Sequence, residues 1–216
     1  MIDNFMHKGL RKKLVEGLKA KGISDKKVLD AINLIPRHLF IDNAFLNFAY
    51  QDKPFPIGCD QTISQPYTVA FQTELLDVKP YDKILEVGTG SGYQASVLYL
   101  LEAEVFTIER QKDLYKKTKL FLPNLGYNCK FFYGDGYKGL KNFAPFDKII
   151  ITCGAPLVPK DLVNQLKIGG RMVAPIGKGK SQEMYLIKKI SENNVVTSTH
   201  GNFSFVPMLN NKSDSL

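Results

Sequence analysis

The sequence predicts an α/β protein with a doubly wound, mainly parallel sheet, helices on both of its faces, and an N-terminal helical extension. Two observations support this fold class. From about residue 68 onward, short apolar runs alternate with segments of helical periodicity, which is the pattern of successive β-α-β units. In addition, the run FDKIIIT is almost continuously apolar, as expected of a strand buried on both faces of a parallel sheet.

The N-terminal extension is expected to cover residues 1–60 and to end in a loop on the substrate side of a single compact domain, residues 61–216. Its first helix is indicated by apolar residues at helical spacing, namely Leu10, Leu14, Val15 and Leu18. Ser24 is the expected N-cap of a second helix, and Pro36 should stop or kink that helix.

The remaining elements follow in order along the chain. Helices are expected at 69–76, 92–102, 112–126 and 159–166. Strands are expected at 83–87, 105–109, 130–135, 146–152, 169–176 and 183–190. The helical segments show 3.6-residue periodicity or follow a proline, and the strands are short and rich in β-branched and aromatic residues.

Composition excludes several classes of protein. The chain of 216 residues suits one domain, and no apolar run approaches the ~18 residues of a membrane helix. The first ten residues contain an acid and lack an apolar signal core, so secretion is not expected and a cytoplasmic location is. The three cysteines fit reduced thiols. The three histidines have no metal-ligand spacing, so we expect no metal.

The net charge of +8 is concentrated at the N-terminus, where residues 1–40 hold nine Lys or Arg residues against four acidic ones. A basic arm can bind nucleic acid. However, the lysines fall mostly between the apolar positions of an amphipathic helix, and no aromatic residue is interleaved with them for base stacking. We therefore interpret the basic run as a solvated helix face and expect no nucleic-acid partner.

The most informative motif is the glycine loop that follows the first strand of the sheet. In such sheets, ligands bind at the carboxyl ends of the strands. The loop contains Gly88, Thr89, Gly90 and Gly92, with Glu86 two residues before it. A dinucleotide site needs G-x-G-x-x-G, but here the third glycine comes one position early. A carboxylate at this position would repel a pyrophosphate and could hold an ammonium group.

Two further acids follow the next two strands. Glu109 lies 21 residues after Gly88, where a carboxylate can accept hydrogen bonds from both ribose hydroxyls, and Asp135 in the run Gly134-Asp135-Gly136 could accept one from an adenine amino group. Each acid alone could be explained by helix-start or turn chemistry. Together, the three acids predict a ligand with a ribose, an adenine and an ammonium group but no pyrophosphate, and S-adenosylmethionine is such a ligand.

The methyl acceptor is less directly indicated. The fourth strand is followed by TCGAP rather than by the Asn/Asp-Pro-Pro-aromatic run common in enzymes that methylate amino groups of bases. The expected site also contains no histidine or lysine to serve as a general base. A carboxylate acceptor would need none, because an α-carboxyl group with a pKa near ~3.5 is already ionised at neutral pH.

Taken together, these motifs resemble the protein-L-isoaspartate (D-aspartate) O-methyltransferase family. The resemblance extends from IPRHLF through DKPFPIG, QTISQP, ILEVGTGSGYQ, GDG, APFDKIIIT and LKIGGRMVAPIG to FVPM. It implies a Rossmann-like methyltransferase fold, with residues 61–216 as the S-adenosylmethionine-binding domain. It also implies an enzyme that methylates L-isoaspartyl residues in damaged proteins, with D-aspartyl residues as a further candidate, and thereby starts repair through a succinimide. We expect the protein to be a monomer.

The resemblance also assigns residues. Ser64 would be the active-site residue and contact the substrate, Thr62 and Ile63 would lie over the donor, and Val206 and Pro207 would contact the extended substrate. We expect the Ser64 hydroxyl to orient the acceptor carboxylate, and the alternative is that Ser64 only caps the helix that follows.

Other classes of protein remain as alternatives at this point. A methyltransferase that acts on a small molecule or RNA would keep the glycine loop and the acids without needing QTISQP or FVP. A nicotinamide oxidoreductase would need the missing glycine spacing.

Overall fold

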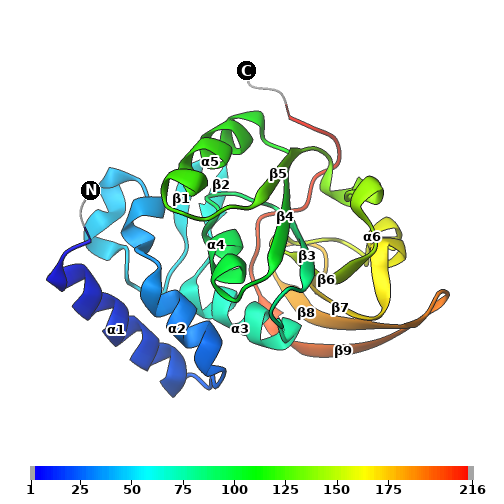
Figure 1. Cartoon of the computed structure of the whole chain (residues 1–216), viewed down its shortest axis with the longest axis horizontal. Coiled ribbons are helices and arrows are strands. Elements are labelled where there is room, and N and C mark those ends of the chain that lie inside the picture. The colour runs from blue at the N-terminus through cyan, green and yellow to red at the C-terminus, as the bar shows by residue number, and fades with distance from the viewer. Residues whose placement is uncertain (1–2, 214–216) are drawn as a thin grey trace.

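A seven-stranded sheet with the order β5-β4-β3-β6-β7-β8-β9 organises the protein (Figure 1). The computed structural model describes residues 3–213. The strands of the sheet are β3 (Lys83–Val87), β4 (Glu104–Glu109), β5 (Lys130–Tyr133), β6 (Phe146–Ile151), β7 (Leu166–Ile176), β8 (Gln182–Ser191) and β9 (Asn194–Phe203). The pairs from β5 to β7 are parallel, whereas β8 and β9 add antiparallel pairs. The expected mainly parallel sheet is confirmed.

Helices cover both faces of the sheet, as predicted. The α-helices are α1 (Phe5–Ala20), α2 (Lys26–Leu34), α3 (Pro66–Leu76), α4 (Tyr93–Leu100), α5 (Lys112–Asn124) and α6 (Lys160–Gln165). One apolar core joins residues of α1 to α5 to one face of the sheet, and a second core joins α6 to the other face. Short 3-10 helices are η1 (Arg37–Phe40), η2 (Asn43–Phe48), η3 (Gly136–Lys138) and η4 (Lys141–Phe143).

The edge strand β9 was not predicted. Its sequence NVVTSTHGNF is largely polar, and most of its residues are exposed. It is a strand because its backbone pairs with β8 from Ser191↔Asn194 to Gln182↔Phe203. A two-residue turn between the strands makes this pairing local, but the low hydrophobicity of an exposed edge hides it from pattern analysis.

The second helix begins one residue later than predicted. Asp25 is the N-cap of α2, and its carboxylate accepts hydrogen bonds from the amides of Lys27 and Val28. A carboxylate can accept more hydrogen bonds than a hydroxyl and also interacts favourably with the helix dipole. The prediction that Ser24 caps this helix was therefore wrong. Ser24 instead donates through its amide and its hydroxyl to the Glu74 carboxylate in α3.

A small hairpin connects the N-terminal helices to α3. It consists of β1 (Phe55–Gly58) and β2 (Gln61–Ile63), which pair in antiparallel fashion. Its turn is formed by Cys59 and Asp60, both with positive φ, as in the type I′ turns that suit two-residue hairpins. The hairpin brings the end of β2 against the carboxyl edge of the main sheet, where the glycine loop lies.

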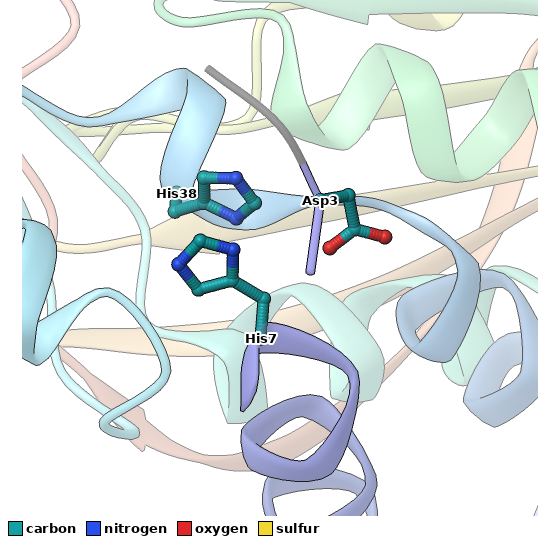
Figure 2. A group of neighbouring side chains, drawn as sticks. All are labelled: Asp3, His7 and His38. Atoms are coloured by element: carbon teal, nitrogen blue, oxygen red, sulfur yellow. The ribbon is translucent and has the colours of Figure 1, made fainter. Parts of the chain in front are cut away.

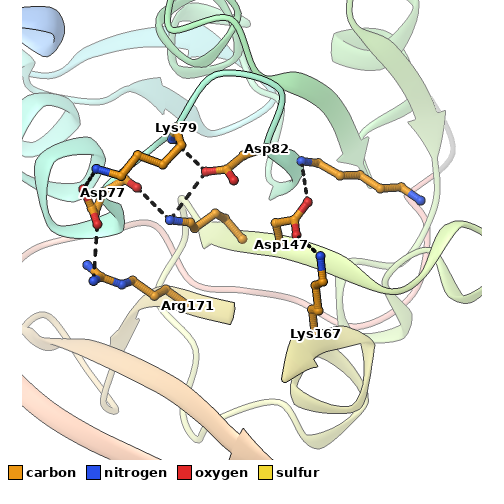
Figure 3. A network of polar contacts seen from close by, with 8 residues as sticks. Asp77, Lys79, Asp82, Asp147, Lys167 and Arg171 are labelled. Atoms are coloured by element: carbon orange, nitrogen blue, oxygen red, sulfur yellow. Dashed lines mark hydrogen bonds and ion pairs between the residues drawn. The ribbon is translucent and has the colours of Figure 1, made fainter. Parts of the chain in front are cut away.

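The opposite, amino end of the sheet is held by a network of charged residues around the first residues of β3 and β6 (Figure 3). Lys148 is largely buried, and its ammonium group donates to the Asp77 carbonyl at 2.7 Å and lies 3.5 Å from the Asp82 carboxylate. Asp77 also pairs with Arg171. Because the network lies away from the glycine loop, we interpret it as structural.

Within residues 3–213, no helix is both long and apolar enough to cross a membrane.

Candidate active site

A cavity lies at the carboxyl ends of β3, β4 and β6. Its wall combines the end of the hairpin, the glycine loop, the end of β4 and a C-terminal segment, which are far apart in the sequence. Of the residues predicted as functional, those that line it are Thr62, Ile63, Ser64, Gly88, Thr89, Gly90, Glu109, Gly136, Val206 and Pro207. The structure thus brings together most of the predicted site.

The three loop glycines have different physical roles. A Cβ on Gly88 would lie 2.5 Å from Thr152 Oγ1, and one on Gly92 would lie 2.3 Å from Leu122 Cδ1. These two glycines are therefore required by neighbours inside the protein. A Cβ on Gly90 would meet only Ile57 Cδ1, at 3.4 Å. Gly90 is thus the least crowded of the three, and its positive φ suits glycine.

Glu109 connects the glycine loop to the end of β4. Its carboxylate accepts hydrogen bonds from the amides of Gly90 at 2.9 Å and Gln111 at 2.8 Å. The side chain is nearly buried, and this desolvation raises the pKa of the carboxyl. A carboxylate has about four acceptor sites, so Glu109 can hold the loop and still accept hydrogen bonds from a ligand in the cavity.

Four of the predicted cofactor residues do not line the cavity: Glu86, Gly92, Gly134 and Asp135. Glu86 was expected to face the ligand, but its side chain is fully buried and accepts a hydrogen bond from Thr107 Oγ1 at 2.5 Å. Desolvation raises its pKa to about 8. Glu86 therefore does not line the cavity, and its raised pKa and burial favour its neutral form.

Asp135 likewise serves the local backbone. Its two carboxylate oxygens accept hydrogen bonds from the amides of Tyr137 and Asn211, so Asp135 has the turn role considered as the alternative. Gly134 precedes Asp135, and a Cβ on it would lie only 2.9 Å from Ile108 Cδ1, so its neighbour leaves no room for a side chain. Contact of Glu86, Gly92, Gly134 and Asp135 with the donor stays a prediction.

Two buried polar atoms in the cavity wall were missed by the sequence analysis. The Tyr93 hydroxyl and Gln94 Oε1 have no hydrogen-bond partner among the described residues. Gln94 Nε2 donates to Thr73 Oγ1 at 2.9 Å, which fixes the orientation of the amide. Buried polar groups are rarely left unpaired, so Gln94 Oε1 fits a polar ligand such as S-adenosylmethionine, whereas Tyr93 packs against the buried Arg37 guanidinium. In the sequence, the run GYQ indicates only a helix start.

Ser64 follows β2 and precedes α3. The helix begins at Pro66, and its N-cap is Gln65, which makes no side-chain capping bond. Ser64 therefore does not cap α3, and the alternative role considered for it is excluded. Its carbonyl accepts a hydrogen bond from Arg37 Nη2 at 3.0 Å. Its hydroxyl makes no hydrogen bond within residues 3–213 and lines the cavity.

A second hollow adjoins the cavity on the far side of Ser64. Aromatic and small polar side chains line it, including Tyr67, Ser181 and Phe203. Four residues line both hollows, namely Thr62, Ser64, Thr152 and Val206. They form a shared wall between the two hollows. Thr152 was not predicted as a site residue.

The C-terminal segment is held in this wall by backbone hydrogen bonds to the loop after β6. The Gly154 amide donates to the Val206 carbonyl at 2.8 Å, and the Met208 amide donates to the Gly154 carbonyl at 2.8 Å. Gln182 Oε1 accepts a hydrogen bond from the Phe205 amide at 2.9 Å. The FVP segment is thereby fixed beside Ser64 although more than 140 residues separate them in the sequence.

A separate polar cluster lies at the N-terminus (Figure 2), where potential metal-ligand atoms of Asp3, His7 and His38 lie within 4.8 Å of one another. Both Asp3 oxygens accept hydrogen bonds from the Arg11 guanidinium, and His38 Nδ1 is bonded to the Tyr50 hydroxyl at 2.6 Å. The two imidazole rings are stacked, with centroids 3.8 Å apart. The lone pairs of stacked imidazole rings lie in the ring planes and do not converge on one ion. We therefore interpret the cluster as a structural contact that holds α1 against η1.

The fold and the cavity together define a Rossmann-like methyltransferase. The glycine loop follows the first strand of the parallel sheet, an acid ends the second strand, and the cavity adjoins a second hollow across a shared wall.

Comparison with known proteins identifies the family. The model of the protein-L-isoaspartate (D-aspartate) O-methyltransferase family matches residues 9–213. Curated protein-L-isoaspartate O-methyltransferases from Christiangramia forsetii and Flavobacterium psychrophilum are 58% and 56% identical over 213 residues, which are 98% of this chain and 100% of each relative. The chain belongs to the protein-L-isoaspartate (D-aspartate) O-methyltransferase family.

Solved structures agree with this assignment. A protein-L-isoaspartate O-methyltransferase structure superposes with a TM-score of 0.84 at 30% identity, covering 93% of this chain and 66% of that one. A Plasmodium falciparum structure, assigned to the same enzyme and determined in complex with S-adenosyl-L-homocysteine, has a TM-score of 0.80 at 27% identity and covers 93% and 99% of the two chains.

Proposed function

We propose that this protein transfers a methyl group from S-adenosylmethionine to the free carboxylate of L-isoaspartyl residues in damaged proteins. The methyl ester can then close to a succinimide, which hydrolyses in part to normal aspartate. Family membership and the names of the close relatives support this activity. The observation that carries it is the wall of four residues between the two hollows, with Ser64 in it.

The first cavity would hold the donor. Gly90 and Glu109 line this cavity and would contact the nucleoside part. Thr62 and Ile63 also line it and would lie over the donor, and the unpaired Gln94 Oε1 would accept a hydrogen bond from a polar group. When bound, the donor supplies an electrophilic methyl carbon on a sulfonium. The contribution of the protein is to fix its position and to exclude water from the reacting centre.

The second hollow would hold the acceptor. Its described lining contains no Asp, Glu, His, Lys or Arg side chain. It therefore offers no general base, and a carboxylate acceptor needs none, because it is ionised at neutral pH. It also offers no fixed negative charge that would repel the carboxylate. The Ser64 hydroxyl can donate to the acceptor carboxylate and orient it. Val206 lines both hollows and would flank the substrate, whereas Pro207 lines only the first cavity, so its contact with the substrate stays a prediction.

We also propose that the protein acts as a cytoplasmic monomer without a nucleic-acid partner. The three cysteines are unpaired, which suits a reducing compartment. Arg110 is the one basic residue in the described lining of the two hollows, which gives little basis for phosphate contacts.

The activity can be tested with labelled S-adenosylmethionine and two peptides that differ only in an isoaspartyl or an aspartyl residue. We expect base-labile label in the isoaspartyl peptide alone, because a methyl ester hydrolyses in mild base. A D-aspartyl peptide tests the second candidate acceptor. Equal labelling of the isoaspartyl and aspartyl peptides, or of neither, would contradict the proposal.

A further inference from the structure

Arg37 is a fully buried arginine that connects the N-terminal extension to the active site. It lies in η1 directly after Pro36, and none of its surface is exposed. Within residues 3–213, no carboxylate lies within ion-pair distance of its guanidinium, and burial outweighs the influence of Tyr93 and the more distant Asp52, which favour its charge. A buried charge without a counterion costs stability, so stability alone is a poor explanation for an arginine here.

The guanidinium donates instead to three backbone carbonyls from separate segments. Its Nε donates to Ala49 at 3.1 Å, and its Nη2 donates to Lys53 at 3.2 Å and to Ser64 at 3.0 Å. Such charge-assisted hydrogen bonds are stronger than those between neutral groups. They connect the end of η2 and the segment before the hairpin to the residue that faces the acceptor.

The same guanidinium also lies against the donor side of the site. Its central carbon is 4.8 Å from the centroid of the Tyr93 ring, a distance that permits a cation–π interaction. Tyr93 is the first residue of α4, directly after the glycine loop, and lines the donor cavity. Arg37 therefore lies between the helix that begins at the donor loop and the backbone of the acceptor-side serine.

We propose that Arg37 is a positioning residue for methyl transfer, which fixes the Ser64 backbone relative to the start of α4 and thereby aims the Ser64 hydroxyl at the acceptor. This inference rests on the role of Ser64 in the proposed function. Arg37 lines neither hollow, so its effect passes through Ser64 and not through contact with a substrate. A methionine of similar volume would remove the charge and the hydrogen bonds to the three carbonyls.

The test is a double-mutant cycle with Arg37→Met and Ser64→Ala, in which single-turnover rate at saturating substrates, donor affinity and melting temperature are measured for each protein. We expect Arg37→Met to slow transfer by about tenfold or more while the donor Kd stays within about threefold. In the Ser64→Ala background, the same change should slow transfer by less than about twofold, because the group that it positions is already lost.

Arg11→Lys is the matched control. Arg11 is also buried in the extension and bonds Asp3 and the Asn33 carbonyl, but it does not contact Ser64. The Arg11→Lys variant should melt at a lower temperature than the parent and transfer the methyl group at the parent rate. If Arg37→Met does not fold, Arg37→Lys, which keeps the charge without the planar fork, replaces it in the cycle.

Two outcomes overturn the inference without affecting the proposed function. In the first, Arg37→Met transfers at the parent rate. In the second, adding Arg37→Met slows transfer by the same factor in the Ser64→Ala background as in the parent, which would show that its effect does not pass through Ser64. If Ser64→Ala itself transfers at the parent rate, the assigned role of Ser64 fails, and the inference about Arg37 fails with it.

Discussion

Replacement of Glu86 by glutamine should change how the stability of this protein depends on pH. Glu86 is fully buried at the end of β3, and desolvation raises its pKa to about 8 from an ordinary value of 4.5. In the unfolded chain, the carboxyl loses its proton near the ordinary pKa, whereas in the folded protein it stays neutral up to the raised one. The stability that the protein has when Glu86 is protonated in both states is therefore fully present below pH 4.5. The free energy of unfolding then falls as the pH rises toward about 8, because only the unfolded chain loses this proton.

The magnitude follows from this window. Between about pH 5.5 and 7.0, the unfolded state has mostly lost the proton and the folded state has not, so the parent loses about 1.4 kcal/mol of stability per pH unit from this group, or about 2 kcal/mol in all. Glutamine has nearly the same shape and does not titrate, so the variant lacks this loss. The glutamine amide adds a buried NH2 group that needs a hydrogen-bond acceptor, but the resulting loss of stability is the same at pH 5.5 and at pH 7.0.

The assay is urea unfolding of parent and variant at pH 5.5 and 7.0. Relative to the parent, Glu86→Gln should be more stable at pH 7.0 than at pH 5.5 by about 2 kcal/mol. Glu16→Gln, at an exposed position of α1, is the control and should show the same pH dependence as the parent. A stability difference between Glu86→Gln and parent that is the same at both pH values would refute the reasoning that Glu86 is neutral in the folded state.

The other predictions concern catalysis and donor binding. Ser64→Ala should keep its melting temperature, because Ser64 does not cap α3. It should bind the donor within a few-fold of the parent, but single-turnover transfer should slow by about ten- to a hundredfold. A variant that melts lower yet transfers at the parent rate would contradict this role. Glu109→Ala should weaken donor binding measured by calorimetry by about 1.5–3 kcal/mol, the range for hydrogen bonds to a charged group, and unchanged affinity would show that Glu109 only holds the Gly90 and Gln111 amides. Gln94→Leu should bind S-adenosylhomocysteine more weakly than the parent does, because Gln94 Oε1 is an unpaired acceptor in the cavity wall, and equal affinity would mean that the ligand leaves this atom unpaired. The transfer rate under saturating substrates should be nearly flat from about pH 6 to 8, because the acceptor is ionised throughout, whereas a steep rise near neutrality with chemistry limiting would indicate a titrating base.

Much of the site could be predicted from the sequence because its parts are local. A glycine loop directly after an apolar strand is weak evidence on its own. Together with an acid at the end of the next strand, which lies at the same edge of a parallel sheet, it indicates a ligand site. The local pattern alone is therefore enough to predict that Gly88, Gly90 and Glu109 line a cavity at this edge of the sheet. Ser64, Val206 and Pro207 were assigned by resemblance to the family, since nothing local distinguishes that serine from a helix cap.

The tertiary structure decided which way each side chain points. Glu86 and Asp135 occupy the predicted strand ends, yet one is buried against Thr107 and the other bonds backbone amides. Alternation along a strand tells which residues share a face, but the backbone amides and hydroxyls that compete for a carboxylate are known only when the neighbouring segments are packed. For the same reason, the unpaired Oε1 of Gln94 could not be found from the run GYQ.

Long-range pairing was likewise invisible in the sequence. The bond between Gly154 and Val206 joins segments about 50 residues apart, and the bond between Arg37 and Ser64 joins the extension to the segment between β2 and α3. The sequence by itself determined the alternation of strands and helices and the place of the glycine loop, because those follow from hydrophobic periodicity and glycine conformation. Only the folded chain decided that Arg37, Ser64 and Val206 meet beside that loop, because their contacts depend on how distant elements pack.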